Sequence, residues 1–219
     1  MKHLRVGITT VLLLFGATEM SNAAVVNSLP GGTLSPMPDI DFFGSGPQVF
    51  GDGVIWSSEN NSSVFGYDNG YGFDSNGYWG EGLIMAGTND RTSTMTFAFT
   101  TPVTGVGGFI NYAPGYGTPV ISAYDSTSTL IETTTLNFST GGGNNSGMFY
   151  GFLEPTAQIK YFTLSGAYIG IANLTTTEAA PVPEPVSMTL FGIGMAGLIA
   201  SRRREKGCQG ERPPDNSCL

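Results

Sequence analysis

The sequence predicts an all-β protein whose central part folds as a β-sandwich. β-branched and aromatic residues are gathered in many short runs, and segments rich in Gly, Ser, Thr and Asn separate these runs. In 92–100, Met95, Phe97 and Phe99 alternate with threonine and alanine, as in a strand with one buried face. No stretch of this central part keeps the 3.6-residue period of an amphipathic helix. Many short strands with frequent turns are typical of two packed sheets.

Nine runs are the expected strands. The glycine-rich segment 141–147 between two of them is expected to be a flexible loop, and 175–185 a linker to the C-terminal part. The expected strands are 54–58, 82–87, 92–100, 103–112, 118–125, 129–138, 148–154, 159–165 and 167–175.

The N-terminus has the three parts of a secretory signal peptide. Lys2 and Arg5 supply the positive charge, an uncharged and mostly apolar stretch runs over 6–17, and small residues precede a cleavage point after Ala23. We therefore expect residues 1–23 to form a signal helix that is removed on export, and residues 24–178 to be the exported domain.

A second uncharged apolar run lies near the C-terminus. Residues 186–200 would make a helix of roughly 22 Å, which is short for a hydrocarbon core of about 30 Å. The run is apolar on all sides, unlike most core helices, and three arginines follow it at 202–204. We expect a membrane-inserted helix over about 186–201, with the preceding domain exported and the far C-terminus in the cytoplasm.

Three features in order carry a resemblance to a known family. Pro183, Glu184 and Pro185 precede the apolar helix, and Arg202, Arg203 and Arg204 follow it. Together with the signal peptide, residues 179–204 resemble the PEP-CTERM sorting tail of exported proteins in Gram-negative bacteria. The resemblance implies that an exosortase, a membrane cysteine protease, binds the tail transiently and removes it near the motif. The precursor would then be anchored in the inner membrane, and the mature form would lie at the cell surface or outside the cell.

The chain departs from the family pattern after the arginines. Residues 205–219 continue beyond them and contain both cysteines, Cys208 and Cys218. We interpret this segment as a disordered cytoplasmic appendage whose thiols stay reduced.

Charge and composition exclude several functions for the exported domain. Residues 24–181 contain twelve acids and two bases, Arg91 and Lys160, for a net charge of −10. So few bases cannot neutralise many phosphates, which excludes nucleic acid as a partner. The domain has no cysteine, and the single histidine, His3, lies in the signal peptide. Histidine- and cysteine-based catalysis and common zinc sites are therefore excluded, whereas carboxylate chemistry and calcium binding are left open.

A second resemblance covers about 92–175. The runs MTFAFTTPVTGVGGFINY, VISAYDSTSTLIETTT and MFYGFLEPTAQIKYFTLSGAYIGIANL look like jelly-roll modules of exported bacterial proteins, which are similar in architecture to carbohydrate-binding modules. It implies a jelly-roll-like β-sandwich, flanked here by the signal helix and the short transmembrane helix. Such modules often end on an Ile-Asp-Asp-Leu pattern, and this chain has Ile171-Ala172-Asn173-Leu174 instead.

The segment 65–82, FGYDNGYGFDSNGYWGEG, is the candidate binding site. Aromatic faces beside carboxylates and amides suit sugar rings, and the same oxygens could hold calcium. Aromatic-glycine loops that only close the end of a sandwich are the alternative. The candidate carbohydrate-binding residues are Tyr71, Asp74, Asn76, Tyr78 and Trp79, and the candidate calcium ligands are Asp68 and Asp74.

These observations predict a non-catalytic protein of the cell surface or extracellular matrix that associates with extracellular polysaccharide. One alternative is a structural matrix protein that associates with itself. Another is a carboxylate-dependent glycosidase, although no glutamate of the chain begins the Glu-x-Asp-x-x-Glu spacing of some sandwich glucanases.

Overall fold

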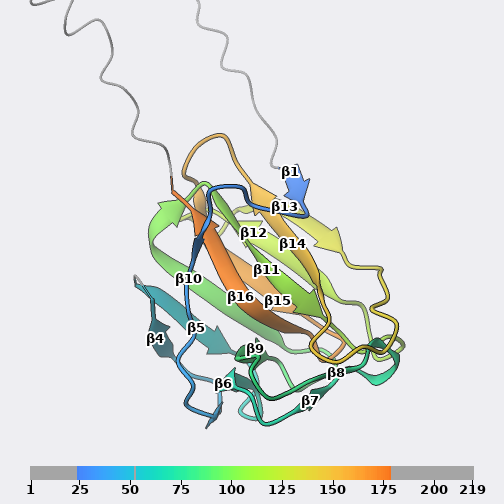
Figure 1. Cartoon of the computed structure of the whole chain (residues 1–219). Helices are drawn as coiled ribbons and strands as arrows, with labels where there is room; N and C mark the ends of the chain where they lie inside the picture. The colour runs from blue at the N-terminus through green and yellow to red at the C-terminus, as the bar shows by residue number, and fades with distance from the viewer. Residues whose placement is uncertain (1–23, 52, 179–219) are drawn as a thin grey trace, which may run out of the picture. The chain divides into compact units, whose positions relative to one another are not determined.

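The protein is described from a computed structural model that covers residues 24–51 and 53–178. Two antiparallel sheets face each other in a β-sandwich, with apolar side chains between them (Figure 1). The expected signal helix at 1–23 and the expected transmembrane helix and Arg cluster lie outside the described residues. Within the described ranges, no helix has the length and apolar character needed to cross a membrane.

The larger sheet has eight strands. Seven follow the order β1-β14-β11-β16-β9-β6-β3, and β2 pairs with β16. The strands are β1 Ala24–Val26, β2 Thr33–Leu34, β3 Phe42–Phe43, β6 Val64–Tyr67, β9 Met85–Gly87, β11 Gly105–Asn111, β14 Met148–Leu153 and β16 Gly170–Thr177.

The smaller sheet has six strands in the order β13-β12-β15-β10-β5-β4. A separate hairpin of β7 and β8 encloses the 3₁₀ turn η1, Asp74–Asn76. The strands of the smaller sheet are β4 Gln48–Phe50, β5 Val54–Ser58, β10 Thr94–Val103, β12 Val120–Tyr124, β13 Leu130–Thr135 and β15 Ile159–Ser165. Those of the hairpin are β7 Tyr71–Gly72 and β8 Tyr78–Trp79.

The structure confirms the all-β prediction and its two-sheet arrangement. Strands β5 and β15 begin and end at the predicted residues, and the other seven predicted strands lie within a few residues of the observed ones. The prediction missed the strands of two to four residues that precede residue 82. It also made β9 too long, since the observed strand begins at Met85 rather than at residue 82. Such short strands do not show enough alternation to be recognised from sequence.

The main core lies between the two sheets. Phe152 of β14 meets Phe162 of β15 edge-on, with ring centroids 6.1 Å apart, so the aromatic contact joins one sheet to the other. Trp56 of β5 stacks on Phe65 of β6, with ring centroids 5.0 Å apart, and this contact also joins the two sheets. These pairs add specific ring geometry to the apolar area that the sandwich buries.

A smaller core lies under the β7–β8 hairpin. Phe73 is fully buried and contacts Tyr71 and Trp79, with centroid distances of 4.9 and 4.8 Å. Trp79 is 1% exposed, and its indole N–H donates to the Ser146 carbonyl at 2.6 Å. The hairpin therefore depends on packing rather than on its two-residue strands. The buried members are Val64, Tyr71, Phe73, Trp79, Met85 and Ala172.

One buried carboxyl group is poorly satisfied. Glu154, directly after β14, is 3% exposed, and its Oε1 has no hydrogen-bond partner among the described residues. Burial, and then the charge of Glu132, raise the pKa of Glu154. The folded protein thus retains this proton to a higher pH than the unfolded chain does. Stability from the protonated group is complete below the unfolded pKa and is lost as the pH rises through the folded pKa.

We expect Glu154→Gln to stabilise the protein at pH 7, because glutamine is neutral at every pH. The melting temperature should rise by about 2–4 °C, the shift that about 1 kcal/mol produces in a domain of this size. Near pH 3.5, where the unfolded glutamate is itself protonated, the gain should vanish. Melting curves across this pH range test the prediction, with the exposed Glu81→Gln as control. An equal gain at both pH values would contradict it.

We expect Trp79→Ala to lower the free energy of unfolding by about 3–5 kcal/mol, since it empties the centre of the smaller core. Urea titration of residues 24–178 measures the change. The neighbouring side chain of Tyr78 is 46% exposed, so Tyr78→Ala should cost less than about 1 kcal/mol. Equal losses in the two variants would show that Trp79 does not anchor the hairpin.

Candidate functional site

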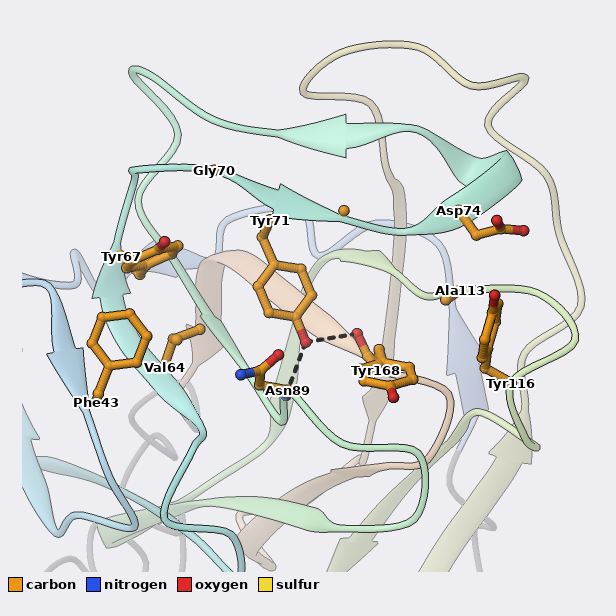
Figure 2. Close-up of a pocket in the computed structure, with 11 residues that line it drawn as sticks. Phe43, Val64, Tyr67, Gly70, Tyr71, Asp74, Asn89, Ala113, Tyr116 and Tyr168 are labelled. Carbon is orange, nitrogen blue, oxygen red and sulfur yellow. Dashed lines mark hydrogen bonds between the residues drawn. The ribbon is translucent and has the colours of Figure 1, made fainter.

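A pocket of about 450 Å³ opens beside the β7–β8 hairpin, at the end of the sandwich where several loops meet (Figure 2). Tyr71 stands near its centre, with Phe43 and Tyr67 on one side and Tyr116 on the other. Five of the eleven lining residues are aromatic, and one is a carboxylate. They are Phe43, Val64, Tyr67, Gly70, Tyr71, Gly72, Asp74, Asn89, Ala113, Tyr116 and Tyr168.

Two edge-to-face aromatic pairs form opposite sides of the pocket. Phe43 of β3 contacts Tyr67 of β6 at 5.2 Å, and Tyr116 contacts Tyr168 at 5.8 Å. Phe43 is 57% exposed and Tyr116 is 40% exposed. Each pair therefore combines a ring that faces solvent with a ring that holds it in place, which is an arrangement suited to stacking on a ligand.

The Tyr71 hydroxyl joins the hairpin to the loops behind it. It donates to the Tyr168 carbonyl at 3.2 Å and accepts the Asn89 backbone N–H at 2.8 Å (Figure 2). Burial raises the pKa of the Tyr71 phenol above its ordinary value, so the group keeps its proton and remains a donor. One side chain thus fixes three segments that are distant in the sequence.

The loop after Asn89 has its own anchor. The Asp90 carboxylate accepts the backbone N–H groups of Thr92 and Ser93, each at 2.8 Å, and both of their hydroxyls. These hydrogen bonds lower the pKa of Asp90 to about 2, the Thr92 amide contributing most. The Asp90 carbonyl in turn accepts the Tyr168 N–H at 2.9 Å. Asp90 therefore orders the loop on which Tyr168 rests.

Three lining residues hold unusual backbone conformations. Asp74, Asn89 and Tyr168 have φ values of 53°, 48° and 53°, and Ala167 next to Tyr168 has 52°. Asn and Asp tolerate this left-handed region, but an aromatic side chain there costs on the order of 1 kcal/mol. The surrounding hydrogen bonds hold Tyr168 in this conformation, and its ring consequently points along the pocket wall.

The structure divides the five predicted sugar-binding residues. Tyr71 and Asp74 line the pocket, whereas Tyr78 is exposed beside it and is not a lining residue. Asn76 and Trp79 are buried, and their side chains bond to the neighbouring backbone, with Asn76 Nδ2 donating to the Tyr112 carbonyl at 3.1 Å. In this structure Asn76 and Trp79 hold the loops together and expose almost no surface, whereas Tyr71 and Asp74 face the pocket.

The glycine-rich loop 141–147, expected to be flexible, is held against the hairpin. Asn145 donates its backbone N–H to the Tyr78 carbonyl at 2.8 Å, and its side-chain oxygen accepts the Gly80 N–H at 2.9 Å. Ser146 accepts the Trp79 indole N–H. Loop and hairpin therefore form one packed unit at the edge of the pocket.

Sequence reasoning missed the six lining residues outside the segment 65–82, which are Phe43, Val64, Asn89, Ala113, Tyr116 and Tyr168. Tyr116 lies in Pro114-Gly115-Tyr116-Gly117, and Tyr168 follows Gly166 and Ala167. An aromatic residue inside a glycine turn is the signal that selected 65–82, and it recurs at both positions. That signal could have marked Tyr116 and Tyr168, although not their proximity.

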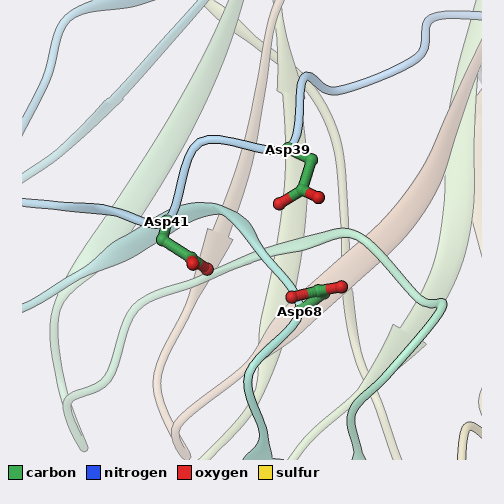
Figure 3. A group of neighbouring side chains, drawn as sticks. All are labelled: Asp39, Asp41 and Asp68. Atoms are coloured by element: carbon green, nitrogen blue, oxygen red, sulfur yellow. The ribbon is translucent and has the colours of Figure 1, made fainter.

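Three carboxylates gather near the Phe43 side of the sheet (Figure 3). Oxygens of Asp39, Asp41 and Asp68 all lie within 4.8 Å of one another. The backbone brings them together because the Gly66 carbonyl accepts the N–H groups of Ile40 and Asp41, at 3.0 and 2.8 Å. Of the predicted calcium ligands, Asp68 meets Asp39 and Asp41, whereas Asp74 is not part of this group. Carboxylate oxygens are ligands that calcium prefers.

Solved structures give distant likenesses to the sandwich. A lectin domain of lectinolysin complexed with Lewis B antigen is 10% identical, with a TM-score of 0.32, and the match covers 44% of this chain and 72% of that one. A fucose-binding module of Streptococcus pneumoniae is 12% identical, with a TM-score of 0.31, over 43% of this chain and 70% of that one. The sandwich thus distantly resembles lectin and fucose-binding modules, at a level that says nothing about its ligand.

No curated protein matches the chain. A family model described as the PEP-CTERM protein-sorting motif matches residues 181–204, which contain the Pro-Glu-Pro sequence, the apolar run and the three arginines. This match confirms the family resemblance of the tail. The chain therefore carries the PEP-CTERM protein-sorting motif, the mark of exported proteins that an exosortase processes.

Proposed function

We propose that this is a non-catalytic protein of the cell surface or extracellular matrix that associates with extracellular polysaccharide through the aromatic pocket. The observation that carries the proposal is the pair of exposed rings, Phe43 and Tyr116, held on opposite sides of one pocket. Rings in this arrangement can stack on the C–H faces of successive sugars. The Asp74 carboxylate and the Asn89 amide are the polar groups that can bond to hydroxyls.

The position of the pocket suits an exported protein with a C-terminal tail. Tyr168 lies just before β16, and the eight residues of β16 extend about 25 Å toward Glu178. Figure 1 accordingly shows the end of β16 and β1 at one end of the sandwich and the β7–β8 hairpin at the other. The chain thus leaves the sandwich toward the sorting motif from the end opposite the pocket.

The sorting steps complete the proposal. A signal peptidase would cut after Ala23, and the helix at about 186–201 would hold the precursor in the inner membrane. The exosortase would then cut near 183–185, shortly after the last strand ends at Thr177. The sequence has prolines at 181, 183 and 185, and proline disfavours helix, whereas proteases bind their substrates in extended form.

A glycosidase is less well supported by the same pocket. Glycoside hydrolysis uses two carboxyl groups, one on each side of the scissile bond, roughly 5–10 Å apart. The lining residues of the pocket include one carboxylate, Asp74. Glu154 has a raised pKa, but it is buried beside β14 and does not line the pocket.

We expect purified residues 24–178 to bind the host's extracellular polysaccharide saturably, and Tyr116→Ala to weaken this binding about tenfold or more. Tenfold corresponds to about 1.4 kcal/mol, in the range that one stacked ring supplies. Phe109 on β11 is similarly exposed and does not line the pocket, so Phe109→Ala should leave affinity unchanged. Isothermal titration calorimetry measures the affinity of the unsubstituted protein and of both variants, in calcium and in chelator. If calcium changes the affinity, the variant Asp68→Asn tests whether the aspartate group is the cause.

The outcomes separate the proposal from its alternatives. Equal loss in Tyr116→Ala and Phe109→Ala would place the binding elsewhere. Absence of binding, together with concentration-dependent association of the protein in sedimentation velocity, would favour a self-associating structural protein. Release of reducing sugar that a single Glu→Gln substitution abolishes would identify a glycosidase.

A further inference from the structure

We propose that the pocket binds a glycan that carries protonated amino groups, such as a polymer of unacetylated hexosamine, in preference to a neutral or uronic-acid polymer. This inference names the ligand class of the pocket and therefore rests on the proposed function. It is carried by the distribution of charge around the aromatic rings, which the sugar-binding proposal does not use.

One aspartate lines the pocket, and two others directly follow lining residues in the sequence. Asp74 is one of its lining residues, near Tyr116 (Figure 2). At the other side, Asp68 directly follows Tyr67, and its carboxylate meets those of Asp39 and Asp41. Asp90 directly follows Asn89. Asp74 is thus the acidic residue that a ligand in the pocket can meet directly, and Asp68 and Asp90 are adjacent in sequence to other lining residues.

Of the two described bases, Lys160 lies away from the pocket, and Arg91 lies beside one of its rings without lining it. Lys160 donates to the Thr100 carbonyl at 2.9 Å, and Thr100 lies in another cavity, beside Thr176 and Glu178 at the far end of the sandwich. The Arg91 guanidinium packs over the Tyr116 ring, 5.5 Å from its centroid, and Arg91 is not a lining residue. No lysine or arginine lines the pocket.

Aromatic rings and carboxylates together attract ammonium groups. The face of a tyrosine or phenylalanine ring is negative, and a cation within about 6 Å of its centroid is stabilised. The Arg91–Tyr116 contact is one such pair, and it takes up one face of that ring. Nearby carboxylates add a field that concentrates cations and repels carboxylates of the same sign. An amino sugar presents both a C–H face for stacking and an ammonium group for this field.

The test compares four oligomers of equal length on the purified full chain in detergent, near pH 5.5, where the sugar amines are protonated. They are oligomers of glucosamine, of N-acetylglucosamine and of galacturonate, and oligolysine, which has amines without sugar rings. We expect glucosamine oligomers to bind about tenfold more tightly than the N-acetylated ones at low salt. The advantage should shrink as salt shortens the range of the charges.

Variants assign the effect to the pocket. Asp74→Asn should remove most of the advantage of the glucosamine oligomer and leave the N-acetylated oligomer unchanged. Asp125→Asn is the matched control, since Asp125 follows β12 at the end far from Tyr116, and it should change neither affinity. Tyr116→Ala should weaken both sugar oligomers. Equal effects of the two aspartate substitutions would contradict the proposal.

The ligand series keeps this inference separate from the proposed function. If the N-acetylated or galacturonate oligomer binds as tightly as the glucosamine oligomer, the amine preference is wrong and sugar binding stands. If oligolysine binds as tightly as the glucosamine oligomer, the pocket attracts charge alone and the inference fails. If neither these oligomers nor the host's polysaccharide binds, the proposed function fails with it.

Discussion

The arrangement of the pocket depends on one buried hydroxyl group. Tyr71 lies in the β7–β8 hairpin, yet its hydroxyl accepts the Asn89 N–H and donates to the Tyr168 carbonyl. Asn89 lies after β9 and Tyr168 before β16, two strands that are neighbours in the larger sheet. The sheet therefore brings the two loops together, and the phenol fixes the hairpin over them. Without this contact the hairpin's two-residue strands would offer little to hold the aromatic wall in place.

At the pocket end of the sandwich, some aromatic side chains are buried and support the loops, whereas others are exposed and available to a ligand. Phe73 and Trp79 are buried and create the small core, whereas Phe43 and Tyr116 remain exposed. Asn76 acts in the same supporting way, because its amide bonds to backbone groups of 112 and 140. Aromatic residues are abundant along 65–82, but burial decides which of them a ligand can reach. A rigid supporting layer under exposed rings lowers the entropy that binding would have to overcome.

Sequence reasoning reached the fold more completely than the site. Strands β5 and β15 were predicted to the residue because their alternation between two environments is visible in the letters. The segment 65–82 was chosen for its aromatic and glycine residues, and two of the residues selected there, Tyr71 and Asp74, line the pocket. Trp79 and Tyr116 show what the sequence could not predict. Both are aromatic residues beside glycine, but Trp79 is buried and Tyr116 is exposed. That difference follows from the sheet order, which joins segments far apart in the chain and leaves no local pattern.

Acidic and basic residues are unevenly distributed between the sandwich and the terminal segments of the chain. Residues 24–178 have few bases, so the arginines at 202–204, together with Lys2 and Arg5, carry most of the positive charge of the chain. In the topology that we propose, this distribution favours a cytoplasmic position for the arginines and lets the acidic domain cross the membrane. The ligand preference that we propose rests on the same acidity, because a surface with a net negative charge repels uronic-acid chains and attracts amines. In the two proposals together, one compositional bias would serve membrane topology first and ligand selection afterwards.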